Sequence, residues 1–244
     1  MKNGLPDRRV RGTIGGDKLD SFDPTRDNTA ALEMIRLLIN SMVSERAHMM
    51  TLDIRNFYLG TPMEEPVHMY ISIDSIPEDI IRKYNLRELA ENGKVVMEVS
   101  STIYGLKEAG KLSQDHLISH LSEYGYKQCR FTPCLFIHES NGAAFTLVVD
   151  DLFVKFQNQT ASDHLIETLR KLYEITIDTA PTQKYIGITL EYNRDEGYLD
   201  MYRSDSIRKV RCEGIQFPDY ICTTSLRCNR SNSTRGQTNG STIR

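Results

Sequence analysis

Long apolar runs and paired cysteine motifs are both absent from this sequence of 244 residues. No stretch approaches the roughly 18 apolar residues that a membrane span requires, and the Met1-Lys-Asn-Gly start has no apolar signal segment. The five cysteines are an odd number without C-x-x-C spacing, which fits neither a zinc site nor a disulfide framework. We therefore expect a protein of a reducing, intracellular compartment that is neither secreted nor bound to a membrane.

A strong charge of one sign is absent as well. The formal net charge is −3 and the isoelectric point is near 6.1, whereas a dedicated nucleic-acid-binding domain often has a value above about 9. Basic residues gather locally: Arg8, Arg9 and Arg11 lie near the start, and residues 203–244 hold eight Lys or Arg against three Asp or Glu. Such patches can hold phosphates, and ordinary solvated surface charge explains them equally well.

Apolar periodicity is present along most of the chain and predicts a mixture of helices and strands. Expected helices are residues 27–44 capped by Asp27, 77–90 begun by Pro77, a segment around 117–124 ended by Gly125, and a segment capped by Ser162. Expected strands are residues 48–54, 67–73, 94–99, 134–138 and 185–192. Their irregular alternation, with hairpins, favours the α+β class. Residues 219–244 are polar and aperiodic, which predicts a disordered tail behind a folded domain at 1–218.

Three aspartates give the first indication of function. Asp150 and Asp151 interrupt an apolar stretch whose flanks read as two buried strands, and Asp53 follows another strand-like run far upstream. A two-residue hairpin turn prefers Asn-Gly or Asp-Gly, so Asp-Asp breaks the local rule. Adjacent carboxylates repel unless a cation neutralises them, and three carboxylates suit two divalent ions about 3.5 to 4 Å apart. Mg²⁺ is the expected ion, and a solvated acidic turn is the alternative.

Six short blocks, in a fixed order, carry the strongest indication. They are Arg9-Val-Arg-Gly12, Leu52-Asp53-Ile-Arg-Asn-Phe-Tyr58-Leu-Gly, Ile103-Tyr-Gly-Leu-Lys-Glu-Ala-Gly110, Thr132-Pro-Cys-Leu-Phe136, Val148-Val-Asp-Asp151 and Lys184-Tyr-Ile-Gly-Ile188. Over about residues 8–207 the chain thereby resembles the reverse transcriptase domain of copia-type and related long-terminal-repeat retrotransposons. The resemblance implies an α+β, right-hand polymerase with fingers and palm on an antiparallel sheet.

The same resemblance implies roles for particular residues. The expected catalytic residues, which would hold two Mg²⁺ or Mn²⁺ ions, are Asp53, Asp150 and Asp151. The expected contacts of the incoming nucleotide are Tyr58, Arg9, Arg11, Tyr104, Gly105 and Lys107. The expected contacts of primer or template are Lys184, Tyr185 and Gly187. Gln114, on the helix that follows the third block, can also hydrogen-bond a template sugar or phosphate, although a surface glutamine is the commoner case. The implied partners are an RNA or DNA template with its primer, deoxynucleotide triphosphates and other parts of a retrotransposon polyprotein, in the cytoplasmic setting of a virus-like particle.

Tyr58 is expected beside the sugar, where a bulky ring would clash with a 2′-hydroxyl. In an unbroken strand Tyr58 would lie on the opposite face from Asp53, so this role requires the chain to bend after Ile54. Without the resemblance, ordinary core packing of Tyr58 and Phe57 is equally expected.

Three departures from the family pattern keep alternatives open. Val148 stands where the family has tyrosine, Glu108 where it has glutamine and Gly110 where it has proline. The similarity also fades beyond about Ile207, which implies a truncated or absent thumb. An RNA-directed DNA polymerase is therefore one interpretation, and a degenerate, non-catalytic remnant that keeps the palm fold and at most binds nucleic acid is the other. A metal-dependent phosphohydrolase is a weaker third.

Overall fold

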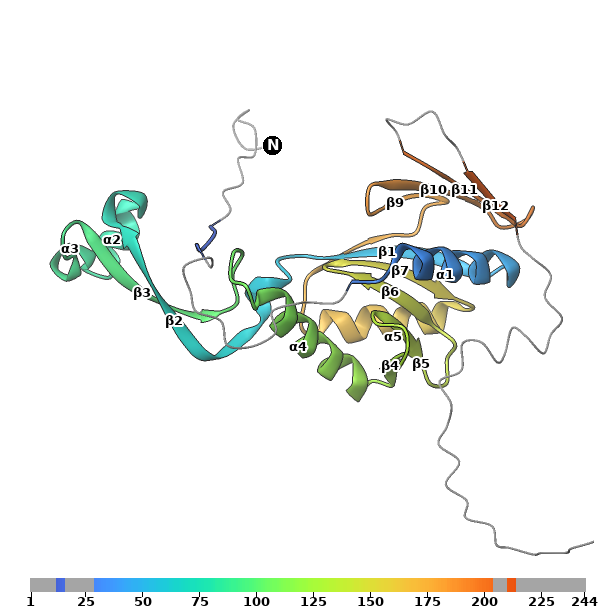
Figure 1. Cartoon of the computed structure of the whole chain (residues 1–244), viewed down its shortest axis with the longest axis horizontal. Helices are drawn as coiled ribbons and strands as arrows, with labels where there is room; N and C mark the ends of the chain where they lie inside the picture. The colour runs from blue at the N-terminus through green and yellow to red at the C-terminus, as the bar shows by residue number, and fades with distance from the viewer. Residues whose placement is uncertain (1–11, 16–28, 204–209, 214–244) are drawn as a thin grey trace, which may run out of the picture.

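The computed structural model describes residues 12–15, 29–203 and 210–213. Figure 1 shows a body, in which two sheets pack with helices, and a narrow arm that projects from it. The body contains α1, α4, α5, β1 and β4–β12, and the arm consists of β2, β3, α2 and α3. Every strand pair is antiparallel. The expected α+β class is confirmed.

The main sheet of the body has six strands in the order β4-β5-β6-β7-β1-β8. Their bounds are Tyr126–Gln128, Leu135–His138, Ala144–Val148, Asp151–Phe156, His48–Ile54 and Ile175–Asp178. The central strands β6, β7 and β1 are apolar on both faces because other elements cover both sides of the sheet. The carboxylates that interrupt this apolar pattern lie at the ends of strands.

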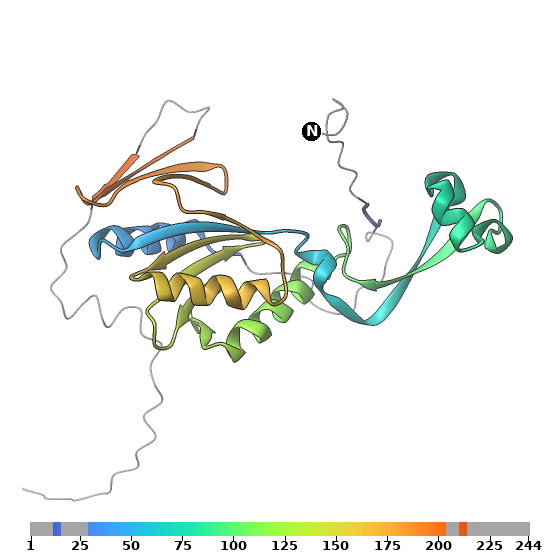
Figure 2. The same cartoon turned by 180° about the vertical axis from the view of Figure 1, so that it is seen from behind.

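Helices cover the two faces of the main sheet. The helices are α1 (Leu32–Ser44), α4 (Ala109–Glu123) and α5 (Gln159–Arg170). α1 lies on the face toward which Lys155 of β7 points, since the Lys155 ammonium is 2.7 Å from Glu45 Oε1 and 2.9 Å from Ser41 Oγ. α4 and α5 lie together on the opposite face (Figures 1 and 2). Because residues alternate along a strand, Asp151 lies on the same face as Lys155.

A second sheet lies over that same face, beside α1. Its order is β12-β11-β10-β9, with bounds Val210–Glu213, Tyr198–Tyr202, Ile188–Asn193 and Thr182–Tyr185. Tyr185 of β9 packs its ring 5.7 Å from that of Phe153, and its hydroxyl is 3.3 Å from Thr146 Oγ1. The β9–β10 hairpin is therefore anchored to β6 and β7, close to the strand end that carries Asp151.

The arm is a two-stranded ribbon that reaches away from the body in Figures 1 and 2. Its elements are β2 (Pro62–Ser72), η3 (Ile73–Ser75), α2 (Glu78–Lys83), α3 (Leu86–Leu89) and β3 (Lys94–Ser101). Large apolar residues are exposed on it, including the cross-strand pair of Tyr70 and Val96. Ile81 and Val95 are its buried apolar side chains. The arm thus has little interior of its own.

Several expected element boundaries are corrected by the structure. α5 is capped by Asn158, whose Oδ1 accepts from Ala161 N at 2.9 Å, so the expected cap at Ser162 is wrong. The expected strand at 185–192 is broken into β9 and β10 by a turn in which Ile186 and Gly187 both have positive φ. The expected helix at 77–90 is divided because Asn85 adopts a left-handed conformation. In each case a local polar or turn preference overrides the apolar period.

Other expectations fall where the structure gives no description. The boundary at 218 and the tail at 219–244 lie outside the described residues. Asp27 lies outside them as well, but α1 begins at Leu32 with Ala31 at its N-cap, so the expected helix start and cap at Asp27 are wrong. Among the helices that are described, none is both long and apolar enough to cross a membrane.

Candidate active site

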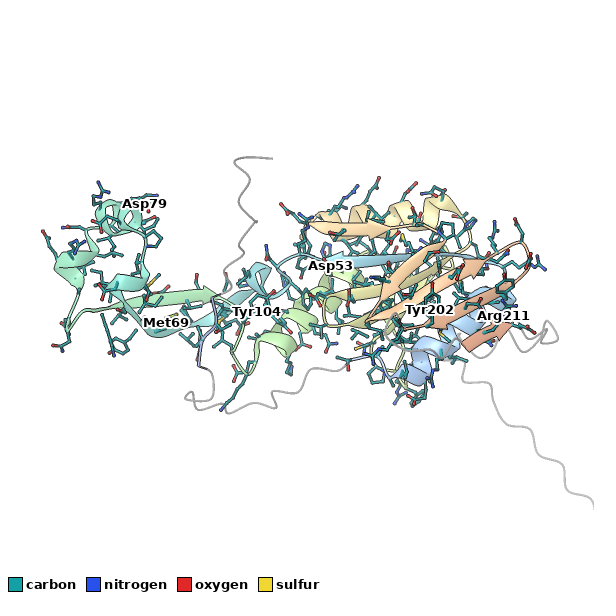
Figure 3. All side chains as sticks on the ribbon, turned by 90° about the horizontal axis from the view of Figure 1, so that it is seen from above. Asp53, Met69, Asp79, Tyr104, Tyr202 and Arg211 are labelled. Atoms are coloured by element: carbon teal, nitrogen blue, oxygen red, sulfur yellow. The ribbon has the colours of Figure 1, made fainter. Side chains whose placement is uncertain are left out.

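Asp53 and Asp151 face each other across two neighbouring strands. They are directly paired in the antiparallel register of β1 and β7, so both side chains lie on one face of the main sheet. Side chains in such pairs have their Cβ atoms about 4.5–5.5 Å apart. A bond of 2.9 Å from Ile54 N to Asp150 O also joins the β6–β7 turn to the end of β1. Figure 3 shows Asp53 where the body meets the arm.

The β6–β7 turn is shifted by one residue from the expected position. Val148 pairs with Asp151, so the two central residues are Val149 and Asp150, not Asp150 and Asp151. Val149 has φ of +57°, and a positive φ at the first central residue alone is the pattern of a type II′ turn, which normally has glycine there. A β-branched residue in this conformation is strained and persists only where its surroundings impose it. The strain lies next to Asp150.

The electrostatics of the site are unfavourable for the protein alone. Burial, followed by the negative charges of Asp150 and Asp53, raises the pKa of Asp151 to about 6. Within the described part of the chain, no lysine or arginine forms an ion pair with Asp53 or Asp151. Like charges that face each other across a strand pair destabilise a sheet. The arrangement would therefore gain stability from an added cation.

The donor chemistry fits Mg²⁺, although the side chains do not converge. Carboxylate oxygens are the hard ligands that Mg²⁺ prefers, and this ion keeps substrate and water oxygens in its shell, so few protein ligands suffice. Among the described residues, no group of three or more His, Cys, Asp or Glu side chains is close enough to enclose an ion. A bound ion would offset the repulsion between Asp53, Asp150 and Asp151.

The chain bends sharply after β1, as the predicted role of Tyr58 requires. Asn56 takes a left-handed conformation with φ of +52°, and the single 3₁₀ turn η2 (Tyr58–Gly60) follows. The bend separates two adjacent rings: Phe57 is buried and packs 5.8 Å from Tyr173, whereas Tyr58 is half-buried with its ring edge-on to Tyr104 at 5.1 Å. Tyr58 is therefore available beside the carboxylate end of β1, and its contact with a sugar stays a prediction.

Gly105 is required by the protein's own backbone. Its φ is +96°, and a Cβ at this position would lie 2.0 Å from Ile14 O. Ile14 N also donates to Tyr104 O at 2.8 Å, so residues 12–15 lie directly against this turn. The close neighbour of Gly105 is thus Ile14, and a contact with nucleotide stays a prediction. Lys107, at the start of α4, is exposed.

The remaining predicted contacts divide into exposed and interior residues. Lys184 and Gly187 are exposed on the β9–β10 hairpin. Tyr185 is buried, and Gln114 is buried with its Nε2 2.9 Å from Cys134 Sγ, so both point into the body. Arg9 and Arg11 lie outside the described residues. Thus the three aspartates and Tyr58 are gathered at one end of the main sheet, whereas Gln114 is directed elsewhere.

Arg55 is a residue near the site that the sequence analysis did not single out. Its Nε is 3.2 Å from the hydroxyl of Thr176, which pairs with Asp53 across β1 and β8. A guanidinium group therefore lies beside Asp53, on the side away from Asp151, with Glu174 3.9 Å away. The available signal was a basic residue directly after the strand that carries Asp53.

Comparison with known proteins gives a consistent family. A profile described as reverse transcriptase (RNA-dependent DNA polymerase) matches residues 14–212. A putative transposon Ty5-1 protein of Saccharomyces cerevisiae is 25% identical over 73% of this chain and 54% of its own length. The Pol polyprotein from transposon TNT 1-94 of Nicotiana tabacum is 22% identical over 78% of this chain and 14% of its own. The Ty1-ER2 Gag-Pol polyprotein of S. cerevisiae is 22% identical over 77% of this chain and 10% of its own length.

The chain thus spans about half of one relative and a small part of the others. Among solved structures, apo telomerase from Candida tropicalis, truncated from its C-terminal domain, is similar over 66% of this chain and 39% of that chain, with 10% identity and a TM-score of 0.39. The family profile covers most of the chain and includes the paired aspartates, the strained turn and the bend at Tyr58. The protein therefore belongs to the reverse transcriptase (RNA-dependent DNA polymerase) family, as a copia-type retrotransposon domain.

Proposed function

We propose that the chain is an RNA-directed DNA polymerase domain that transfers nucleotides to a primer 3′-hydroxyl, with Asp53, Asp150 and Asp151 as metal ligands. One observation carries the proposal: Asp53 faces Asp151 in register beside the turn that holds Asp150, and the pKa of Asp151 is raised to about 6. A catalytic carboxylate cluster is a common reason for such a shift.

The body and arm correspond, in this proposal, to the palm and fingers of a right-hand polymerase. Asp53 and Asp151 present carboxylate oxygens from rigid strands, while Asp150 extends from the turn. Two Mg²⁺ or Mn²⁺ ions, when bound, would neutralise these charges, activate the primer hydroxyl and stabilise the leaving pyrophosphate. Tyr58 would lie against the sugar of the incoming deoxynucleotide and disfavour a 2′-hydroxyl. Rigid strands limit reorganisation at the site as charge develops.

The partners proposed for this domain are a primer annealed to an RNA or DNA template, and deoxynucleotide triphosphates. Relatives named as Pol and Gag-Pol polyproteins support a role beside other parts of a retrotransposon polyprotein. The balanced charge of the chain predicts weak binding of primer–template, because few phosphates would be neutralised.

The test is primer extension on poly(rA)·oligo(dT) with Mg²⁺ at low salt. Asp150→Asn should lower extension by about 10²–10³-fold, the scale of removing a group that stabilises developing charge. Asp163→Asn, on the exposed side of α5 across the sheet from the site, is the matched control and should extend like the unsubstituted chain.

Equal extension by Asp150→Asn and the unsubstituted chain would contradict the metal-ligand assignment. No extension by the unsubstituted chain, with primer–template binding retained in an electrophoretic shift, would instead favour the non-catalytic domain.

A further inference from the structure

The turn that carries Tyr58 cannot hold its own position. η2 is three residues long, and a single 3₁₀ turn has poor hydrogen-bond geometry and little stability in isolation. It follows a left-handed residue, Asn56, and precedes the long ribbon of the arm. The placement of the Tyr58 ring therefore depends on contacts from outside the turn.

Thr102 supplies two of these contacts. It lies directly after β3, and its side chain is completely buried. Its backbone N–H donates to Thr61 O at 2.9 Å, and its hydroxyl donates to the carbonyl of Tyr58. One residue thus binds the turn at both ends.

Ser113 of α4 extends this contact into the body. Its hydroxyl oxygen is 3.2 Å from Thr102 Oγ1, and it is also completely buried. A carbonyl can only accept, so the single Thr102 proton is committed to Tyr58 O, and Ser113 must donate to Thr102. The result is a directed chain of hydrogen bonds from α4, through Thr102, to the backbone of Tyr58. Buried networks of this kind are rigid when every member is satisfied.

The same segment also holds the ring. Tyr104, two residues after Thr102, packs edge-on against Tyr58 with ring centres 5.1 Å apart. Tyr104 is in turn fixed by its backbone bond from Ile14. Both the backbone and the ring of Tyr58 are therefore positioned by residues 102–104, which directly follow the end of β3 that returns to the body.

We infer that Thr102 is a positioning residue that fixes Tyr58 and thereby sets the discrimination between deoxynucleotides and ribonucleotides. The inference rests on the proposed function, because discrimination requires a polymerase. A ring that excludes one hydroxyl group must be held to within a fraction of an ångström, and loss of its anchor lets it move away from the sugar. Thr102 itself touches no substrate in this scheme.

The first experiment compares dUTP with UTP, which differ only at the 2′ position, in primer extension on poly(rA)·oligo(dT). Thr102→Val keeps the shape and removes the hydroxyl, and the preference for dUTP in kcat/KM should fall about tenfold, the scale of one buried hydrogen bond. Ser113→Ala should lower it about threefold, because it removes only the outer donor. Thr102→Ser keeps the hydroxyl and should restore the preference. Thr189→Val, a buried threonine of β10 in the second sheet, should leave it unchanged.

A second experiment does not depend on activity. The sequence contains no tryptophan, so Tyr58→Trp introduces a single tryptophan at the position in question. Adding Thr102→Val to this variant should raise the acrylamide quenching constant about twofold as the ring becomes more accessible, whereas adding Thr102→Ser or Thr189→Val should not. Far-ultraviolet circular dichroism and a thermal melt establish that each variant is folded. If Thr102→Val does not fold, Ser113→Ala gives the same comparison.

The outcomes separate the two proposals. An unchanged quenching constant, an unchanged dUTP preference, or an equal loss of both nucleotides in folded Thr102→Val would overturn the role of Thr102. Failure of the unsubstituted chain to extend with dUTP would overturn the polymerase, and discrimination with it, while the quenching comparison would still decide whether Thr102 holds residue 58.

Discussion

The two ends of strand β7 differ in whether a charged side chain has a partner of opposite charge. Near one end, Lys155 is 6% exposed and lies 2.7 Å from Glu45, which is 28% exposed, with Ser41 as a further acceptor. At the other end, Asp151 faces Asp53, and among described residues no lysine or arginine pairs with either. The two ends are four residues apart, about 13 Å along one strand and on one face.

The pKa directions express the same contrast. Burial alone would raise the pKa of Glu45, but Lys155 and two further hydrogen-bond donors outweigh burial and lower it. At Asp151 burial and two neighbouring carboxylates act together and raise the pKa to about 6. A buried charge that the fold neutralises is part of the structure. A half-buried charge left to repel its neighbours is a candidate for a site that is completed by a bound ion.

The largest change in stability is expected at the Lys155 end of β7, where the charge is neutralised. Lys155→Met should lower the free energy of unfolding at pH 7 by about 3 kcal/mol, because it leaves Glu45 partly buried beside α1 without its cation. The exposed pair of Lys127 and Glu139 provides the control, where Lys127→Met should cost less than about 0.5 kcal/mol. Urea unfolding of the three proteins measures both values. Equal costs at the two sites would remove the distinction between a buried and an exposed pair.

At the Asp151 end of β7, removing a charge should stabilise the protein instead. Asp151→Asn should raise the free energy of unfolding at pH 7, without divalent ions, by about 1–2 kcal/mol after allowance for solvent screening. The folded pKa is above the unfolded one, so the unsubstituted chain loses stability as the pH rises from about 4 to about 6, and the gain of the variant grows over that window.

Urea unfolding of Asp151→Asn between pH 4 and pH 7 measures this gain, with Asp163→Asn as the exposed control. A gain that does not change with pH would contradict the repulsion inferred for the carboxylates.

The smallest change in stability is expected when Mg²⁺ is added. At about ten times its dissociation constant, Mg²⁺ should raise the free energy of unfolding of the unsubstituted chain by about 1.4 kcal/mol through mass action. The increase should weaken below about pH 6, as Asp151 takes up a proton, and should be lost in Asp151→Asn. Thermal melts with and without MgCl₂ detect it. An increase that survives in Asp151→Asn would place the ion elsewhere.

Sequence patterns predicted helices and strands best where no second cap or turn residue competed with the main pattern. The strand at 48–54 is found with the expected bounds, because five of its seven residues are buried and strand-forming or apolar residues dominate it. The helix ended by Gly125 is also found, with that glycine at φ of +85°. Ser162 failed as a cap because Asn158, one turn earlier, is as good a cap. The strand at 185–192 failed because Ile186 is strand-forming by composition, yet occupies a turn at positive φ.

The site was predicted in its residues but not in its geometry. The three aspartates were recognised from their break in apolar runs and from the family blocks. The shift of the turn onto Val149 was not, because a valine at positive φ contradicts every local preference. Nor did Thr102 give any signal, since a threonine before a turn is unremarkable until its hydroxyl is seen to reach Tyr58. Gln114 was predicted from its place on the helix that follows a family block, yet its amide is directed into the body.

The sequence alone determined which residues are apolar and which family the blocks resemble, since these depend on the residues and their order along the chain. Only the tertiary structure decided that Asp53 stands in register with Asp151 and that Thr102 binds the turn of Tyr58. Those pairings join segments about 100 and 44 residues apart. Their register follows from how the whole sheet packs against its helices, because sliding one strand by a single residue would turn every side chain to the other face.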